Sequence, residues 1–581
     1  MDPLPFSSPW WSRALTLSER ITILRDNNNR HSSLALQSND AKGQNQLQRW
    51  RREPQFVSES IFDRRLAADG IDQHTLAYIL GDPAEVIKQH SEKPVWLEWL
   101  AESFSQPASA FANPPPGAEE LCFLDLIQPL IDLACDQLFI GVEQILTNHP
   151  DSPFDRQIIE DILLPNLPGP LLTRLSRTLV LELNVARLQG HLSGETSAER
   201  FESFVEYIRQ PEQAISILSE YPVLARQLVI CLNQWVDAIL EFLDRLSSDW
   251  PEICRKFFHE QDPGLLVEVA AGAGDTHRGG RSVIIAQFES GLRLVYKPKS
   301  LAIDNHFQQL LAWLNARDFK PHFRTLELLD CGSYGWVEYI ARQECHEIEE
   351  VKRFYRRLGA YLALLYAINA SDFHLENLIA SGEQPLLIDL ETLFNPEFER
   401  FETTDASTSA AKAMLNSVLV VGMLPQRLWS AEEYTGVDIS GFGGESGQLS
   451  PERVPLPHGQ GTDEMRYVRQ RLEMAGEANR PLLEGREISA LDHVPEIIGG
   501  FRSMYHLLLQ YRHDLLDDGG PMSWFNNDET RVLLRPTRTY DQLLFESFHP
   551  DILRDALPRD LHFDRLWLVV PDRPYMESAV A

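Results

Sequence analysis

The sequence predicts an α+β protein in which a large helical region precedes a small antiparallel sheet and a second, mainly helical part. Three observations support this class. Apolar residues recur at three- and four-residue spacing from Leu121 to about Phe258, as they do along one face of a helix. Short β-branched runs separated by turn residues begin near Leu265. The helical spacing returns after Val351, so the sheet is flanked by helices on both sides in the sequence.

Length, charge and cysteine spacing limit the class of protein. A chain of 581 residues contains several domains, since a domain usually holds about 100–200 residues. The 85 acidic and 53 basic residues give a net charge of −32, which disfavours nucleic acid as a partner. The six cysteines lack C-x-x-C spacing, which indicates thiols in a reducing compartment and no zinc site. With neither a signal peptide nor an apolar run long enough to span a membrane, we expect a cytoplasmic protein without a membrane span.

The first 258 residues are predicted to be helical in two parts. Residues 16–19, Thr-Leu-Ser-Glu, have the spacing of a capping box and predict a helix start within the first part, residues 1–120. Residues 26–53 are polar and predict a mobile loop or insertion, and the prolines at 114–116 indicate a linker. The second helical part covers residues 121–258, and its acidic side chains are interpreted as solvated helix faces.

Residues 259–345 have the element order of a protein-kinase small lobe. The runs LLVEVA, VIIAQF and LRLVYK predict three strands, and a Gly-rich loop at residues 271–281 separates the first two. The third strand ends in Lys297, and the helix-like stretch IDNHFQQLLAWLN follows it. We therefore predict a kinase-like two-lobed fold, with residues 346–581 as a helical large lobe that carries inserted helices.

The segment from Asp372 onward has the spacing expected for phosphoryl transfer. That chemistry requires a phosphate-binding Lys, a carboxylate near the nucleophile, and Asn and Asp ligands for magnesium. Lys297 ends a strand, as the kinase Lys does, and Asp372 and Asn377 are five positions apart, as in the kinase catalytic loop. Asp389 follows an apolar strand, as the metal-binding Asp of kinases does. The joint order of these residues predicts a phosphotransferase site.

The predicted magnesium ligands are Asn377 and Asp389, because magnesium prefers hard oxygen donors. Glu391 lies two residues further on and points to the same side of an extended segment, so it would bind the metal directly or through water. The sequence around Lys297 departs from ordinary kinases, because the next helix has no Glu in its middle. Its partner would be Asp304, Glu327 or another residue.

Three further polar residues are candidates near the phosphates. His374 would orient Asp372 or contact phosphate, with a purely structural role as the alternative. Asp275 and His277 lie in the Gly-rich loop, where nucleotide phosphates would bind, and ordinary turn polarity is the alternative interpretation.

Several motifs resemble the dehydratase domain of class II lanthipeptide synthetases, the LanM family. The likeness extends over residues 200–570. The motifs that carry it are GDTHRGGRSV, LVYKPKSLAIDNHFQQLLAWLN, WVEYI, FYRRLGAYLALLYAINASDFHLENLIA, PLLIDLETLF, VVGMLP, VDISGFGG, IIGGFRSMYHLLLQYR and RVLLRPTRTYDQLL.

The resemblance implies an activity on a precursor peptide that carries a leader. ATP and Mg²⁺ would serve to phosphorylate Ser and Thr, and elimination of the phosphate would leave dehydroalanine or dehydrobutyrine. The resemblance assigns phosphorylation to Lys297, Asp372, His374, Asn377 and Asp389, elimination to Arg531 and Thr537, and phosphate handling to Asp275 and His277. On chemical grounds, Arg531 or Arg535 could hold the departing phosphate through bidentate contacts.

Members of that family continue into a zinc-dependent cyclase whose Cys and His ligand motifs are missing from this sequence. We therefore expect a chain truncated at its C-terminus, without zinc and with a separate cyclase as a candidate partner. Two alternatives stay open. One is a kinase-like phosphotransferase that stops at the phosphate ester, and the other is an inactive peptide-binding fragment.

Overall fold

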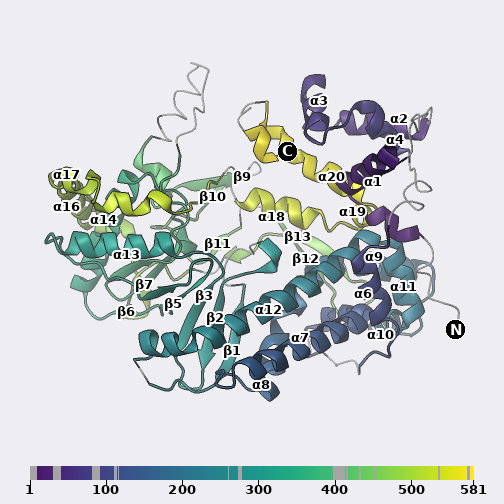
Figure 1. Ribbon diagram of the computed structural model, residues 1–581, viewed down its shortest axis with the longest axis horizontal. Coiled ribbons are helices and arrows are strands. Elements are labelled where there is room, and N and C mark those ends of the chain that lie inside the picture. Colours follow the sequence, from purple (N-terminus) through teal and green to yellow (C-terminus); the bar gives the residue numbers. More distant parts are fainter. Residues whose placement is uncertain are drawn as a thin grey trace.

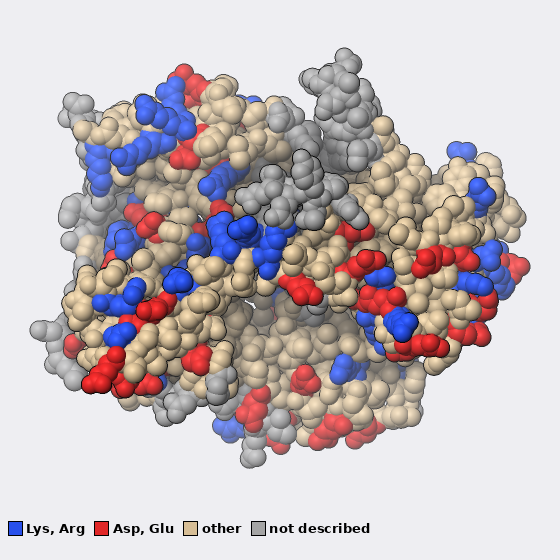
Figure 2. Space-filling view, turned by 180° about the vertical axis from the view of Figure 1, so that it is seen from behind, with Lys and Arg blue, Asp and Glu red and all other residues tan. Residues whose placement is uncertain are grey.

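The protein has a mixed architecture of many helices around a small sheet (Figure 1). The computed structural model describes residues 9–30, 41–81, 92–109, 114–115, 117–259, 261–272, 278–396, 413, 416–430, 433–450, 453–474, 476–533, 537–571 and 576–580. Seen from behind, a group of basic side chains lies near the middle of the face (Figure 2). The predicted α+β class, with its large N-terminal helical region and small antiparallel sheet, is confirmed. The kinase-like lobes and the domain boundaries stay predictions.

The first helices form a small unit that begins at the predicted capping box. The main-chain N–H of Thr16 donates to the Glu19 carboxylate at 2.8 Å, and the Glu19 N–H donates to Thr16 Oγ1 at 3.3 Å. The described helices of this part are η2 (Pro9–Ala14), α1 (Leu17–Arg30), α2 (Ala41–Arg51), α3 (Glu59–Ala68), α4 (Gln73–Leu80) and α6 (Val95–Ser103).

The prediction of a mobile loop over residues 26–53 is wrong where α1 continues to Arg30 and where α2 lies. Although α2 is polar in composition, one short face of this helix is apolar. Leu47 and Trp50 are buried against neighbouring helices, and Gly43 lets α2 approach the main chain of α4 at Ala77. This local packing, rather than average hydrophobicity, stabilises α2.

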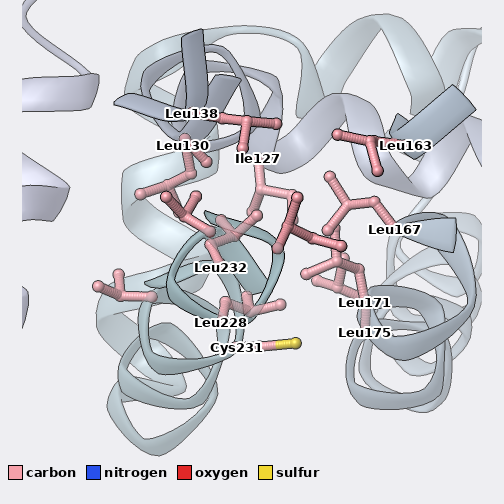
Figure 3. Packing of buried hydrophobic residues seen from close by; sticks show 14 of the residues in the cluster. Ile127, Leu130, Leu138, Leu163, Leu167, Leu171, Leu175, Leu228, Cys231 and Leu232 are labelled. Atoms are coloured by element: carbon pink, nitrogen blue, oxygen red, sulfur yellow. The ribbon is translucent and has the colours of Figure 1, made fainter. Parts of the chain in front are cut away.

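The second helical part packs around the long helix α12 (Pro222–Phe257), which lies against α7 (Gln128–Asn148) and α9 (Pro168–Leu188) (Figure 1). Figure 3 shows leucines from these helices, such as Leu171 and Leu228, meeting in one apolar core. The other elements here are η3 (Glu119–Ile127), α8 (Arg156–Leu163), η4 (Leu164–Asn166), α10 (Ser197–Ile208) and α11 (Pro211–Glu220).

Among the described residues, α12 is the one helix long and apolar enough to cross a membrane by length and composition alone. Half of its most apolar window is buried inside the protein. A core helix passes the same test, and the packing of α12 between other helices explains its apolar sequence.

The sheet has five antiparallel strands in the order β1-β2-β3-β5-β4. The predicted run of three strands is confirmed, because β2 pairs with both β1 and β3. Their bounds are β1 (Leu266–Ala271), β2 (Ile284–Phe288), β3 (Arg293–Lys297), β4 (Leu328–Asp330) and β5 (Gly335–Glu338). Helix α13 (Ala302–Asn315) follows β3, as the sequence predicts, and packs through Phe307 and Leu310 into a second core.

Two helices of the later part approach each other closely through glycines. Helix α14 (Ile348–Ala367) packs on α16 (Val494–Gln510). A Cβ atom at Gly359 would collide with the Ile497 carbonyl, and one at Gly500 would collide with the Arg356 carbonyl. Gly500, the second of the paired glycines in the IIGGFRSMY motif, therefore allows α16 to approach α14 closely.

The remaining elements comprise short strands and C-terminal helices. They are β6 (Glu344–Cys345), η6 (Leu375–Asn377), β7 (Leu378–Ser381), β8 (Gln384–Leu387), η7 (Val418–Val421), β9 (Arg427–Ser430), β10 (Glu433–Asp438), β11 (Gln448–Leu449), β12 (Val454–His458), β13 (Arg466–Gln470), β14 (Glu473–Met474), β15 (Leu482–Leu483), β16 (Arg486–Glu487), η8 (Ala490–His493), α17 (Arg512–Leu516), η9 (Pro521–Asn527), α18 (Thr537–Glu546), α19 (Pro550–Leu553), α20 (Ala556–Phe563), η10 (Asp564–Val569) and α21 (Glu577–Val580).

The C-terminal helices return to the N-terminal unit, as Figure 1 shows for α20 beside α1. Trp567 is buried in the same apolar cluster as Leu17 and Phe62. The Trp50 indole N–H donates to Asp564 at 2.8 Å. Both ends of the sequence therefore contribute to one core.

Candidate active site

The loop after α14 holds Asp372 in a left-handed backbone conformation, with φ of +67°. Neighbouring hydrogen bonds fix this conformation, which is uncommon for a residue with a Cβ atom. Asn377 Nδ2 donates to the Asp372 carbonyl at 2.8 Å, and the Phe373 N–H donates to the Val421 carbonyl at 2.9 Å. Thr392 Oγ1 donates to the carbonyl of Ser371 at 2.6 Å. The loop therefore joins the two predicted residues Asp372 and Asn377 in one hydrogen-bonded turn.

His374 lies beside Asp372. Its Nε2 atom is 4.0 Å from Asp372 Oδ2, and its Nδ1 atom accepts a hydrogen bond from the Glu376 N–H at 3.3 Å. Because Nδ1 accepts, the proton of a neutral His374 ring resides on Nε2, the nitrogen that faces Asp372. This geometry fits the predicted orienting role, while the role itself stays a prediction.

Lys297 is buried at the end of β3, where it has two partners. Its ammonium lies 3.3 Å from Asp304 Oδ1 and donates to the Ile388 carbonyl at 2.7 Å. Of the candidate partners left open by the sequence, the structure selects Asp304, in the first turn of α13. Asp304 Oδ2 is buried and has no hydrogen-bond partner among the described residues. The pair brings β3, α13 and the strand end before Asp389 together.

Asp389 and Glu391 face a second lysine that sequence reasoning missed. Lys299 Nζ donates to Asp389 Oδ1 at 2.8 Å and to Glu391 Oε2 at 2.9 Å. Burial raises the pKa of Asp389, but the charges of Lys299 and Lys297 outweigh it and hold this pKa below its ordinary value. In an extended segment, residues two positions apart point to the same side, as assumed for Asp389 and Glu391. The same rule applied to Lys297 would have identified Lys299 from the sequence.

Glu391 also binds Arg531 from a distant part of the sequence. Arg531 Nη1 donates to Glu391 Oε1 at 2.6 Å, and the Arg531 N–H donates to the Glu391 carbonyl at 2.6 Å. The two residues are 140 positions apart. The structure therefore brings a residue predicted for elimination against one predicted for metal binding.

The structure describes only some of the other predicted site residues. Thr537 is the first residue of α18. Asp275, His277 and Arg535 lie outside the described residues. The end of the Gly-rich loop is anchored to α12, because Arg281 Nε donates to Glu241 Oε2 at 2.9 Å.

The predicted magnesium ligands Asn377, Asp389 and Glu391 carry the oxygen donors that magnesium prefers. Asn377 and Asp389 approach through the β7–β8 hairpin, in which the Ile388 N–H donates to the Asn377 carbonyl at 3.1 Å. The Asp389 and Glu391 carboxylates already hold one positive group, the Lys299 ammonium. Across the described part of the chain, no group of three or more His, Cys, Asp or Glu gathers as a metal cluster. Magnesium accepts such a sparse site, since phosphates and water complete its coordination.

Comparison with protein families identifies the part of the sequence from residue 221 to residue 581. A family model described as "Domain of unknown function (DUF4135)" matches residues 221–581. The chain belongs to this family. DUF4135 is a LanM-associated domain, so the resemblance to LanM-type lanthipeptide synthetases is confirmed.

The chain is also similar to a protein named for lantibiotic biosynthesis. The chain is 27% identical over 383 residues to the lacticin 481/lactococcin biosynthesis protein LcnDR2 of Lactococcus lactis subsp. lactis. The alignment covers 63% of this chain and 40% of that protein. The DUF4135 chain therefore matches well under half of the relative's length.

Proposed function

We propose that this DUF4135 chain dehydrates Ser and Thr side chains of a lanthipeptide precursor in two steps at one site. ATP phosphorylates the hydroxyl first, and the phosphate is then eliminated to leave dehydroalanine or dehydrobutyrine. The contact between Glu391 and Arg531 carries this proposal, because it joins the groups assigned to the two steps. The relative named for lacticin 481 and lactococcin biosynthesis supports the substrate class.

In the first step, the hydroxyl oxygen of Ser or Thr attacks the γ-phosphorus of ATP. The bond from that phosphorus to the bridging oxygen of ADP breaks, and Asp372 accepts the hydroxyl proton. His374 orients Asp372, and Lys297, held by Asp304, contacts the nucleotide phosphates. Asn377, Asp389 and Glu391 would hold magnesium, which would supply positive charge to neutralise the phosphates.

In the second step, a base removes the α-proton of the phosphorylated residue. A carbon–carbon double bond forms, the Cβ–Oγ bond breaks, and inorganic phosphate leaves. Arg531 is suited to hold this leaving group, since a guanidinium binds phosphate through two parallel hydrogen bonds. Glu391 positions Arg531 through its main chain and its side chain. Thr537, at the start of α18, assists this step.

Mass spectrometry of a co-expressed precursor peptide tests the proposal. The unmodified chain should remove one water per modified Ser or Thr. Asp372→Asn should abolish every mass change, whereas Arg531→Ala should accumulate phosphopeptide, because elimination fails after phosphorylation succeeds. Matched controls are Asp518→Asn and Arg502→Ala, two exposed residues outside the site, which should dehydrate normally.

Three results would contradict the assignment. Phosphopeptide as the final product of the unmodified chain would indicate a phosphotransferase without elimination. No mass change in any sample would indicate a peptide-binding protein. Normal dehydration by the Arg531→Ala variant would remove the elimination role of this residue.

A further inference from the structure

The hairpin of β12 and β13 forms a two-stranded ribbon with asymmetric edges. Val454 pairs with Gln470 and His458 pairs with Arg466. Within the described residues this ribbon has no third strand. The outer edge of β12 is poor in donors, because Pro455 and Pro457 lack N–H groups. Strand β13, with the sequence RYVRQ, contains no proline and keeps an N–H donor at every position. The outer edge of β13 can therefore pair with another extended chain.

Cations flank this edge on both sides. Arg466 and Arg469 are three positions apart on one strand, so their side chains point to opposite faces. Both are exposed, and neither forms an ion pair within the described part of the chain. Arg453, just before β12, is exposed as well. Figure 2 shows basic side chains gathered near the middle of the rear face. In a chain of net charge −32, this ribbon is locally basic.

The tip of the ribbon is anchored to the helical region. Asp463, which is fully buried, accepts a hydrogen bond from Arg200 Nε at 2.6 Å. Asn184 Nδ2 donates to the Met465 carbonyl at 2.9 Å. The β13 edge is therefore held in place before any partner binds, which lowers the entropy cost of binding.

The base of the ribbon adjoins the loop that carries Asp372. Just beyond the base, the Ser450 N–H donates to the Leu472 carbonyl at 2.7 Å, where β11 pairs with β14. Gln448 of β11 accepts a hydrogen bond through Oε1 from the Asp438 N–H at 2.8 Å. Ile439, which directly follows Asp438, accepts a hydrogen bond from the Leu375 N–H at 3.0 Å. A peptide lying along the ribbon would therefore lead towards the candidate active site.

We propose that the outer edge of β13 binds an extended acidic segment of the peptide substrate as an added strand. The identity of this peptide rests on the proposed function. Main-chain hydrogen bonds would give affinity, and Arg466 and Arg469 would select carboxylates on both faces of the added strand. The acidic remainder of the protein surface repels such a segment, which favours binding at this edge.

Fluorescence anisotropy with the full chain and a labelled synthetic peptide of alternating Glu and Val tests the proposal. The double variant Arg466→Glu, Arg469→Glu should weaken binding about tenfold or more, because each attraction becomes a repulsion. Lys320→Glu, Lys352→Glu is the matched control, with the same change in net charge at two lysines outside the ribbon. It should bind as the unmodified chain does, and Arg466→Lys, Arg469→Lys should retain most of the affinity.

Several outcomes would overturn the proposal. These are no binding of the Glu-Val peptide, equal loss in the ribbon and control variants, tighter binding of a Lys-Val peptide, and equal binding of an acidic peptide with alternating prolines, which cannot pair as a strand. Circular dichroism checks that each variant is folded. The Asp372→Asn variant should bind the peptide normally, so a failure of catalysis and a failure of binding are distinguishable.

Discussion

The helical core and the candidate active site differ in what holds them together. Between α7, α9 and α12, leucines such as Leu171 and Leu228 meet in an apolar cluster that depends on volume and burial (Figure 3). Around Asp389, Lys299, Glu391 and Arg531 form a series of ion pairs, and each ion pair requires both of its partners. A substitution in the core should therefore reduce stability alone, whereas one in the charged cluster should change activity as well.

The largest effect that separates the two regions should come from Lys297→Met. Removing one partner of a buried ion pair leaves the Asp304 carboxylate without the ammonium that lies 3.3 Å from it, at a cost of about 4 kcal/mol in unfolding free energy. Peptide modification should also be lost. Urea unfolding and mass spectrometry measure the two effects.

The double variant Lys297→Met, Asp304→Leu sharpens this test. Replacing both charges by apolar groups should restore most of the unfolding free energy but none of the activity. Recovery of activity together with stability would mean that Lys297 is structural only.

A core substitution should have a smaller and purely structural effect. Leu171→Ala removes a fully buried side chain from the cluster, and we expect a loss of about 3 kcal/mol in unfolding free energy. Dehydration per folded molecule should not change at a temperature where the variant stays folded. A lower rate at constant folded fraction would show that the core is coupled to the site.

The smallest effect concerns pH and the contact between the two ends of the sequence. Asp560 accepts a hydrogen bond from the Leu17 N–H at 2.6 Å, and burial raises the pKa of Asp560 to about 6. Its unfolded value is 3.8, so the neutral form is favoured by folding. This contribution is complete below the unfolded pKa and is lost as the pH rises through the folded pKa.

Asp560→Asn should remove this dependence on pH. The drop in unfolding free energy between about pH 4 and about pH 7 should be smaller in the variant than in the unmodified chain, by about 2 kcal/mol. Urea titrations at both values measure it. If the drop in unfolding free energy is the same in both proteins, another group causes the pH dependence.

Features that depend on local sequence were predicted well. Periodicity identified the helices around Leu171 and the three strands that end at Lys297, because each element imposes its own repeat on nearby residues. The prediction from average composition was wrong at α2, where burial of Leu47 and Trp50 stabilises a helix of polar composition. Asp372 and Asn377 lie in one short turn, and their roles stay predictions.

The sequence by itself therefore determined the α+β class, and it supplied the residues that we propose for phosphoryl transfer. Only the tertiary structure decided which groups meet: Asp304 with Lys297, Lys299 with Asp389, and Arg531 with Glu391. The physical reason is distance along the chain. Local repeats follow from backbone geometry within a few residues, whereas the contact of Glu391 with Arg531, 140 positions apart, depends on how whole helices and strands pack.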